Sequence, residues 1–524
     1  MGAENTKGDY HIISGRINDI AWDGDSQRII AVGDGRERFG HCVTADSGNS
    51  VGEVSGHSKV INSVSIRQQR PLRAATGSDD ASLVFLNGAP FKFANKFSDC
   101  HTGYVYGVAF SPDGEHLVSV GADKKIQLYD GKTGEPTKDI GEGVHTGSIF
   151  AVSWAPDSKQ FVTASADQTV RIWNAETGEN TATWRFPAED CGVSIKDHQV
   201  GVCWPAGRTD GLIISINLLG DLNYLYPGER QPKQIVHGHN RSITAAGYTA
   251  GKVLTGSFEG RICAWDITTG TGTAVDGSTH TNQVIGFTTT ANASRAYSVG
   301  WDDTLRVIDP ATSTFLGHSV KLSAQPKGIA ITDDSLYVAT GTGIDIFDAA
   351  ENVLISSFDT PSFEPQAIGG FGQYVCISDD SGNLHVFEAK NTERYRTLVP
   401  HTILHPSSSP ITTLRFSPRG TYLALGTHQG KIQVFETKSW SLVTDRFSAH
   451  TAKIMALDWN EEETHVVSGS LDTNVHVWSL AKPGARVKAP NAHKEGVNGV
   501  VWTKEGKVVS TGGDGAVKVW NIQI

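Results

Sequence analysis

The chain has 524 residues, enough for three or four domains of ordinary size at about 150 residues each. Its 57 glycines and a charged fraction of only 19% exclude a coiled coil or a collagen, and 38% hydrophobic residues argue against disorder. The net charge of −11, with no cluster of five Lys or Arg residues, disfavours a nucleic-acid partner.

The sequence carries no sign of export or membrane insertion. Residues Met1 to Tyr10 are polar, and no apolar stretch approaches the roughly 18 residues that a membrane helix needs. The six cysteines lie far apart and form no CxxC pair, which is typical of reduced thiols. We therefore expect a cytoplasmic protein with no membrane partner.

Along the chain, one pattern recurs with a period of about 44 residues. A histidine opens each copy, an acidic residue follows about 22 positions later, and Trp often follows six positions after that. The pairs that fit are His57 with Asp79, His101 with Asp123, His145 with Asp167, His239 with Glu259, His280 with Asp302, His450 with Asp472 and His493 with Asp514.

Between these markers the sequence predicts short strands and tight turns. Apolar and polar residues alternate, and turns such as Pro112-Asp-Gly114 separate the alternating segments. Divergent copies occupy 17–46, 198–226, 320–348, 363–388 and 410–436, so about twelve repeats fill the chain. Four short strands per repeat predict an all-β protein made of propeller blades, and twelve blades require two β-propellers.

The repeats resemble the WD-repeat family. Gly56-His57, Gly238-His239 and the strand-ending pairs Trp173-Asn174, Trp265-Asp266 and Trp520-Asn521 carry the resemblance. In such blades the His, the acid and a strand Ser or Thr, for instance Ser165, are expected to form a buried hydrogen-bonded set with the Trp.

The sequence predicts no enzyme, cofactor or metal site. A catalytic site needs one asymmetric constellation, whereas these His and Asp residues recur at equivalent places. His401-Thr-Ile-Leu-His405 lies between Pro400 and Pro406 without a following Glu, and is predicted to be a solvated loop. No nucleophile elbow or phosphate-binding loop occurs.

Three irregular segments are candidates for binding, because functional residues lie on loops of a rigid scaffold. Gly33 to His41 is a charged loop, and burying Arg36, Glu37 and Arg38 together would cost a large desolvation free energy. Phe85 to Phe93 places aromatic residues on a connection, and Asp359 to Pro365 does something similar. Local packing of the aromatic side chains is the competing interpretation for the last two.

These loops also resemble those of one group of WD-repeat proteins, through Gly35 to His41, Gly88 to Phe93 and Ser298 to Asp303. The resemblance implies binding to actin filaments decorated by cofilin, the actin-depolymerising factor, and promotion of severing and disassembly at cortical actin structures. It further implies that partner binding involves Glu37, Asp79, Phe93 and Tyr104; Arg38 joins them from the loop itself. Asp79 has a competing structural role as the acid expected to pair with His57.

The alternative is a WD-repeat scaffold for another cytosolic assembly, such as a ubiquitin ligase or a trafficking complex. The resemblance implies fourteen blades in two seven-bladed propellers, so we expect the first two repeats to be missing. The predicted domains are 1–276 and 277–524, with about six repeats each and no outer strand in the last blade; boundaries near 232 and 315 are the alternatives.

Overall fold

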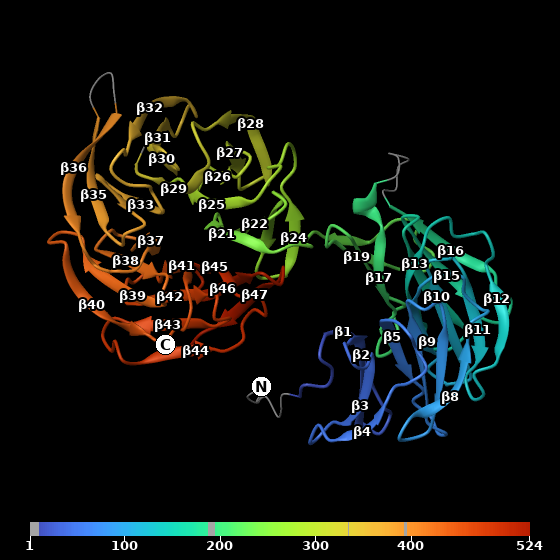
Figure 1. Ribbon diagram of the computed structural model, residues 1–524. Coiled ribbons are helices and arrows are strands. Elements are labelled where there is room, and N and C mark those ends of the chain that lie inside the picture. The colour runs from blue at the N-terminus through green and yellow to red at the C-terminus, as the bar shows by residue number, and fades with distance from the viewer. Residues whose placement is uncertain (1–9, 187–193, 334, 392–395, 524) are drawn as a thin grey trace. The chain divides into compact units, whose positions relative to one another are not determined.

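The computed structural model describes residues 10–186, 194–333, 335–391 and 396–523. In these ranges the chain forms twelve antiparallel sheets and one 3₁₀ turn at Ile195–Asp197. The sheets divide between two compact units, Met1–Val236 (unit 1) and His237–Ile524 (unit 2). The predicted all-β fold with WD-type blades in two propellers is therefore confirmed (Figure 1).

In its described residues, unit 1 has five four-stranded blades that follow one another in chain order. Their strands are β1 (Arg16–Trp22), β2 (Arg28–Asp34), β3 (Gly40–Thr44), β4 (Ser50–Glu53), β5 (Ile61–Ile66), β6 (Arg73–Ser78), β7 (Leu83–Asn87), β8 (Lys92–Phe97), β9 (Val105–Phe110), β10 (His116–Gly121), β11 (Ile126–Asp130), β12 (Pro136–Ile140), β13 (Ile149–Trp154), β14 (Gln160–Ser165), β15 (Thr169–Asn174), β16 (Asn180–Arg185), β17 (Gln199–Cys203), β18 (Ile213–Asn217), β19 (Leu222–Leu225) and β20 (Gln234–Val236). Three large apolar side chains of β1 remain 45–55% exposed, namely Ile17, Ile20 and Trp22.

Unit 2 contains seven blades, of which the last has three strands in the described range. Their strands are β21 (Ile243–Thr249), β22 (Lys252–Ser257), β23 (Ile262–Asp266), β24 (Thr271–Ala274), β25 (Val284–Thr289), β26 (Ala296–Gly300), β27 (Thr304–Asp309), β28 (Thr314–Lys321), β29 (Pro326–Ile331), β30 (Ser335–Thr340), β31 (Gly343–Asp348), β32 (Leu354–Asp359), β33 (Ala367–Phe371), β34 (Tyr374–Ser378), β35 (Leu384–Asn391), β36 (Arg396–Leu404), β37 (Ile411–Phe416), β38 (Tyr422–Thr427), β39 (Lys431–Glu436), β40 (Ser441–Ser448), β41 (Ile454–Trp459), β42 (His465–Ser470), β43 (Val475–Ser479), β44 (Arg486–Ala489), β45 (Val497–Trp502), β46 (Lys507–Gly512) and β47 (Val517–Asn521).

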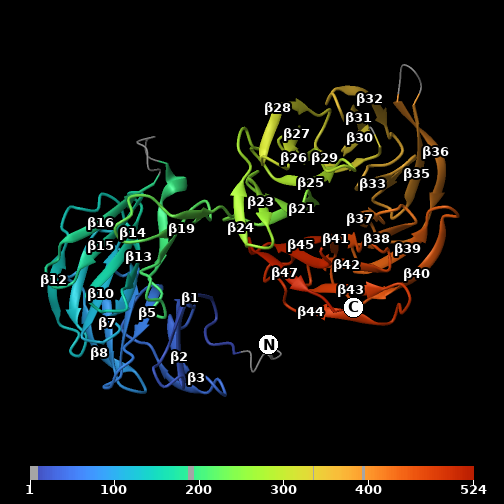
Figure 2. The same cartoon turned by 180° about the vertical axis from the view of Figure 1, so that it is seen from behind.

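The blades of unit 2 close into a ring, with the first strand of each blade toward the centre (Figure 2). Closure joins β21 to β45: Asn498 donates from Nδ2 to the carbonyl oxygen of Ile243 at 2.9 Å. The hydroxyl of Tyr248 lies 3.2 Å from the carboxylate of Glu505 across the same junction. The first and last blades of unit 2 therefore meet although they are far apart in the sequence.

The structure divides one blade earlier than the predicted boundary at 277, close to the alternative near 232. The blade β21–β24 packs against both β25 and β45, so it belongs to unit 2, and the chain divides after Val236. The six-plus-six distribution of repeats is accordingly five plus seven. The sequence spacing counts blades correctly but carries no information about which two blades meet at the closure.

A blade that lies between two neighbouring blades contributes side chains to two hydrophobic cores, one on each face. In β14, Phe161 packs with Trp154 and Val118 on one side, whereas Val162 packs with Trp204 and Ile213 on the other. Successive side chains of a strand point to opposite faces of its sheet. Because both faces of this strand are buried, apolar residues occur at both odd and even positions.

One further prediction is wrong. His401 to Leu404 are not a loop but part of β36, the outer strand that pairs with β35. His401 Nδ1 lies 3.1 Å from the carboxylate of Glu388, and its ring contacts Trp440. His405 Nδ1 lies 2.6 Å from the side-chain oxygen of Asn383. The prolines that flank the segment are tolerated because an outer strand has one edge free of ladder bonds.

Within the described ranges the chain has no helix with the length and apolar character required to cross a bilayer.

Candidate functional site

The recurring histidines are parts of buried hydrogen-bond sets, as predicted. In the blade β13–β16, His145 bonds Asp167 through Nδ1 at 2.8 Å and Thr163 through Nε2 at 2.9 Å, while Trp173 donates from Nε1 to the same hydroxyl at 2.9 Å. The histidine–acid contact recurs in the pairs His101–Asp123, His280–Asp302, His450–Asp472 and His493–Asp514. The Trp bond recurs in the last two of these blades, through Trp478 and Trp520, and the hydroxyl of Tyr129 takes its place beside Ser119.

The hydroxyl in this set is Thr163 rather than Ser165. Ser165 instead accepts a hydrogen bond from the backbone N–H of Asp167 at 3.1 Å and donates to the carbonyl of Gly147. Burial would raise the pKa of Asp167, but hydrogen bonds from His145 and Thr169 hold it below its usual value. The set therefore holds a carboxylate charged inside the blade and fixes the turn that contains it.

Asp80, and not Asp79, is the acid that pairs with His57, at 3.1 Å. The separation between the histidine and the strand hydroxyl is 19 residues here, from His57 to Thr76, against 18 from His101 to Ser119. The additional residue lies before Thr76 and displaces the acid by one position. Counting forward from the strand hydroxyl, as from Thr163 to Asp167, identifies the correct carboxylate.

The predicted pairing of His239 with Glu259 does not form, because Glu259 pairs with a different residue. Glu259 forms an ion pair with Arg241 at 3.1 Å, and both side chains are at least half exposed. His239 bonds Thr255 through Nε2 at 2.7 Å, and Trp265 donates to that hydroxyl. The longer Glu side chain reaches the surface at a turn where Asp usually stays buried.

Because Asp80 occupies the buried set with His57, Asp79 lies outside it, on the surface turn between β6 and β7. Its carboxylate accepts a hydrogen bond from Asn62 Nδ2 at 2.8 Å, and the same nitrogen donates to the carbonyl of Val105 at 3.1 Å. Asn62 thereby ties the Asp79 turn to the start of β9, directly after Tyr104. The structure thus brings Asp79 and Tyr104 onto neighbouring connections of two adjacent blades.

Tyr104 and Phe93 are the exposed aromatic residues of this region, at 46% and 48%. Tyr104 packs edge-on against Tyr106 at 6.3 Å, and the ammonium of Lys59 lies 5.9 Å from its ring. Phe93 is the second residue of β8, the outer strand of the Asp79 blade, and its ring lies over Gly56. Large aromatic side chains half exposed on a rigid scaffold are typical anchors of protein interfaces.

Lys96 links this region to the buried set of His57 and Asp80. Lys96 donates to the carboxylate of Asp80 and to the carbonyl of Gly56, both at 2.9 Å. Sequence reasoning missed Lys59, Asn62 and Lys96. The one available signal was their position beside the irregular segment, since Lys96 follows Phe93 by three residues and Asn62 lies in the segment after His57.

Glu37 and Arg38 lie on the preceding blade, in the turn between β2 and β3. The Glu37 side chain is exposed, whereas Arg38 is half-buried and donates from Nη1 to His41 Nδ1 at 3.3 Å. The third irregular segment packs locally: Phe363 stacks on His385 at 3.9 Å, and Glu364 pairs with Lys327 at 3.0 Å. The five predicted binding residues therefore all belong to the first three blades of unit 1.

Among the described residues, no group of three or more His, Cys, Asp or Glu side chains is arranged to hold a metal ion. The site offers carboxylates, aromatic rings and lysines on rigid turns, which suits recognition of a protein surface.

These blades, with their repeated His, acid, hydroxyl and Trp sets, define a WD-repeat propeller protein. Residues 92–130, 141–174, 395–436, 441–479 and 484–521 match the WD domain, G-beta repeat family. The chain is 34% identical over 523 residues to actin-interacting protein 1 of Caenorhabditis elegans, covering 98% of this chain and 83% of that protein.

Two further relatives show the same extent of similarity. WD repeat-containing protein 1 of Gallus gallus is 35% identical over 525 residues, covering 98% of this chain and 84% of its own. An uncharacterized WD repeat-containing protein of Schizosaccharomyces pombe is 42% identical over 515 residues, covering 97% and 83%. The chain belongs to the WD-repeat family that includes WD repeat-containing protein 1 and actin-interacting protein 1.

Proposed function

We propose that this chain binds actin filaments and cooperates with cofilin, the actin-depolymerising factor, to sever and disassemble them. The observation that carries the proposal is similarity over 98% of the chain to relatives named actin-interacting protein 1. Similarity of this extent spans the irregular turns as well as the repeated blades. The proposed activity is binding, without a chemical step or a cofactor.

The proposed contact surface consists of Glu37, Arg38, Asp79, Phe93 and Tyr104. The exposed rings supply apolar area, and the carboxylates of Glu37 and Asp79 select a basic partner surface. Asn62 holds Asp79 in place by the hydrogen bond at 2.8 Å, which lowers the entropy lost when a partner binds. Unit 2 then provides a second contact to the same filament, so that two weak contacts act as one strong contact.

The test is co-sedimentation of filaments with the protein, with and without cofilin, measuring the actin that remains in the pellet. We expect less pelleted actin only when cofilin and the protein are both present. Equal pellets in the two conditions would refute the proposal and favour a scaffold for another assembly.

A double substitution, Glu37→Ala with Phe93→Ala, tests the surface. We expect loss of cofilin-dependent disassembly, because one charged contact and one aromatic anchor disappear together. The matched control is Glu351→Ala with Val353→Ala, an exposed acid and an exposed apolar residue of unit 2 outside the proposed surface. If both double variants disassemble filaments like the wild type, the surface is assigned wrongly.

The same proposal places the protein in the cytoplasm on the actin cytoskeleton, including cortical structures. A fluorescent fusion should colocalise with filament markers and disperse when filaments are depolymerised.

A further inference from the structure

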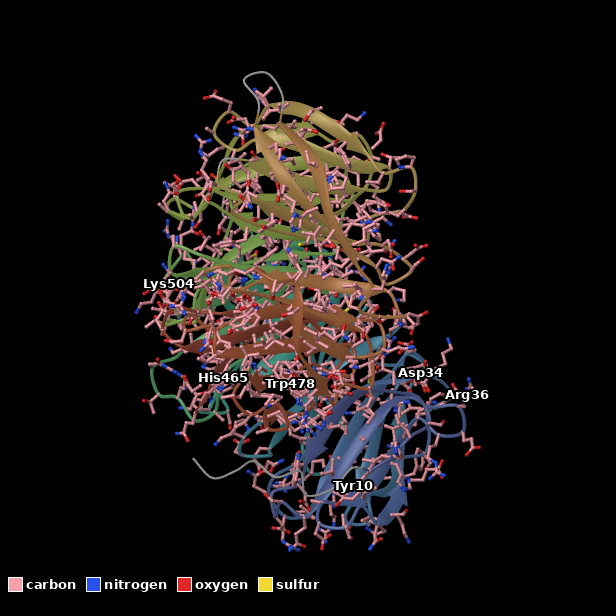
Figure 3. All side chains as sticks on the ribbon, turned by 90° about the vertical axis from the view of Figure 1, so that its left-hand side faces the viewer. Tyr10, Asp34, Arg36, His465, Trp478 and Lys504 are labelled. Carbon is pink, nitrogen blue, oxygen red and sulfur yellow. The ribbon has the colours of Figure 1, made fainter. Side chains whose placement is uncertain are left out.

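A cavity of about 530 Å³ lies on the blade β1–β4 of unit 1. Residues 10–14 form one wall, and the β2–β3 turn with strand β3 forms the other. The wall is pinned at both ends: the hydroxyl of Tyr10 donates to the carbonyl of Asp46 at 2.9 Å, and the backbone N–H of Arg36 donates to Ser14 Oγ at 3.2 Å. In Figure 3, Tyr10 lies over the blue strands of unit 1 and Arg36 lies at their right-hand edge.

Arg38 supplies a positive charge to the cavity without an acidic partner in the described ranges. Its guanidinium has five N–H donors, and its one hydrogen bond runs to the imidazole Nδ1 of His41 at 3.3 Å. Within the described residues of unit 1, four other arginines do have a carboxylate within 4.0 Å, namely Arg28, Arg67, Arg70 and Arg208. A half-buried guanidinium with free donors facing a cavity is suited to an anionic group, which it can bind through two parallel hydrogen bonds.

His41 lines the same cavity and carries a second N–H donor. Its side chain is only 8% exposed, and Nδ1 must accept because Arg38 can only donate. Burial and the Arg38 charge lower the pKa of His41, against the opposing effect of Glu53 on the paired strand β4. The imidazole is therefore neutral at pH 7, with its proton on Nε2.

The rest of the lining favours a carboxylate over a phosphate. Glu37 lines the cavity, and Glu53 faces His41 across the β3–β4 ladder, so a doubly charged anion meets more repulsion than a singly charged one. Ile12, Ile13 and Val43 give the wall apolar surface that fits the methylene stem of an acidic side chain.

We propose that this cavity receives an acidic side chain of a protein partner, with its carboxylate held by Arg38 and the Nε2–H of His41. The proposal rests on the proposed function in one respect, since it names the chemistry that the partner presents at the Glu37–Arg38 turn. Arg38 and Glu37 thus have different tasks: the arginine holds an inserted acid, and the glutamate contacts a basic group at the rim.

The test uses the full chain and a fluorescent hexaglutamate peptide with blocked ends, followed by fluorescence anisotropy at low ionic strength. We expect saturable binding despite the net charge of −11, which disfavours nonspecific attraction of an acidic peptide. Arg38→Gln should weaken this binding about ten-fold or more, because it removes a charge-assisted double hydrogen bond. Arg36→Gln is the matched control, since Arg36 is exposed on the same turn and does not line the cavity.

Equal weakening in the two variants would overturn the proposal, because the attraction would then be diffuse. Absence of saturable binding to the wild type would also overturn it, as would displacement of the peptide by inorganic phosphate at lower concentration than by free glutamate. A thermal melt of each variant confirms folding. Because the assay contains no filament, its failure is distinguishable from failure of the pelleting experiment.

Discussion

Acid should weaken the blade β41–β44 through one buried histidine, His476. Its side chain is 1% exposed, neither ring nitrogen has a hydrogen-bond partner among the described residues, and its ring lies 4.3 Å from that of His450. Burial, together with the charges of His450 and Arg486, lowers the pKa of His476 from its ordinary 6.5 to about 4. Lys488 acts in the same direction, and Asp472 opposes them.

The sign of the effect follows from the direction of the shift. Below pH 6.5 the unfolded chain binds a proton at His476, whereas the folded chain does not bind it until the pH is near 4. The free energy of unfolding therefore falls as the pH decreases toward 4. At about 1.36 kcal/mol per pKa unit, the loss between pH 7.5 and pH 4.5 is about 2.5 kcal/mol.

The perturbation is His476→Leu, which removes the titrating group from an apolar site beside Trp478. The assay is hydrogen–deuterium exchange of peptides spanning β42 and β43 at the two pH values, corrected for the intrinsic exchange rate, which gives the free energy of opening. We expect the wild type to lose about 2.5 kcal/mol more than the variant between pH 7.5 and pH 4.5. His318→Leu, at an exposed histidine on β28, is the control and should behave like the wild type. Parallel losses in the wild type and His476→Leu would refute the reasoning.

Three further substitutions test the architecture. Thr163→Val leaves the His145 and Trp173 nitrogens without their shared hydroxyl and should cost about 2–4 kcal/mol, seen as a lower melting temperature than for Thr183→Val on the exposed face of β16. Asn498→Ala removes the closing bond to β21 and should cost about 1–3 kcal/mol, with faster amide exchange in β21 and β45; unchanged exchange in β21 would contradict the closure. Gly56→Ala introduces a methyl group 2.7 Å from the Phe93 ring, at a residue whose φ is +108°. It should therefore displace Phe93 and weaken filament binding. Unchanged co-sedimentation with filaments would show that Phe93 is not part of the contact surface.

The blades were predictable because their signals are local. Each repeat carries its own alternation, turns and buried His set, and a strand hydroxyl such as Thr163 fixes the acid that follows at a constant distance. The error at Asp79 arose from counting across a turn whose length varies. The hydrogen bond to His57 selects Asp80 by geometry. Counting from the histidine misses this because the turn between β5 and β6 is one residue longer than the turn between β9 and β10.

The candidate binding residues were selected from the sequence, and the contacts around them come from the tertiary structure. Phe93 and Glu37 could be selected because they break the repeat, and the structure leaves both exposed. The contacts that hold the surface, such as Asn62 between Asp79 and the Val105 carbonyl, join different blades. Contacts of this kind depend on how neighbouring sheets stack, for which no short-range pattern exists.

The sequence by itself determined the number of blades and their strand composition, since both follow from local periodicity and turn chemistry. Only the tertiary structure decided where one unit ends and the next begins. Repeats of one family have interchangeable faces, so the sequence allows several divisions of the chain. Closure is selected by which pair of blades completes a ring, and here it joins Asn498 to Ile243 across 255 residues of chain. That long-range contact assigns β21–β24 to unit 2, which therefore has seven blades.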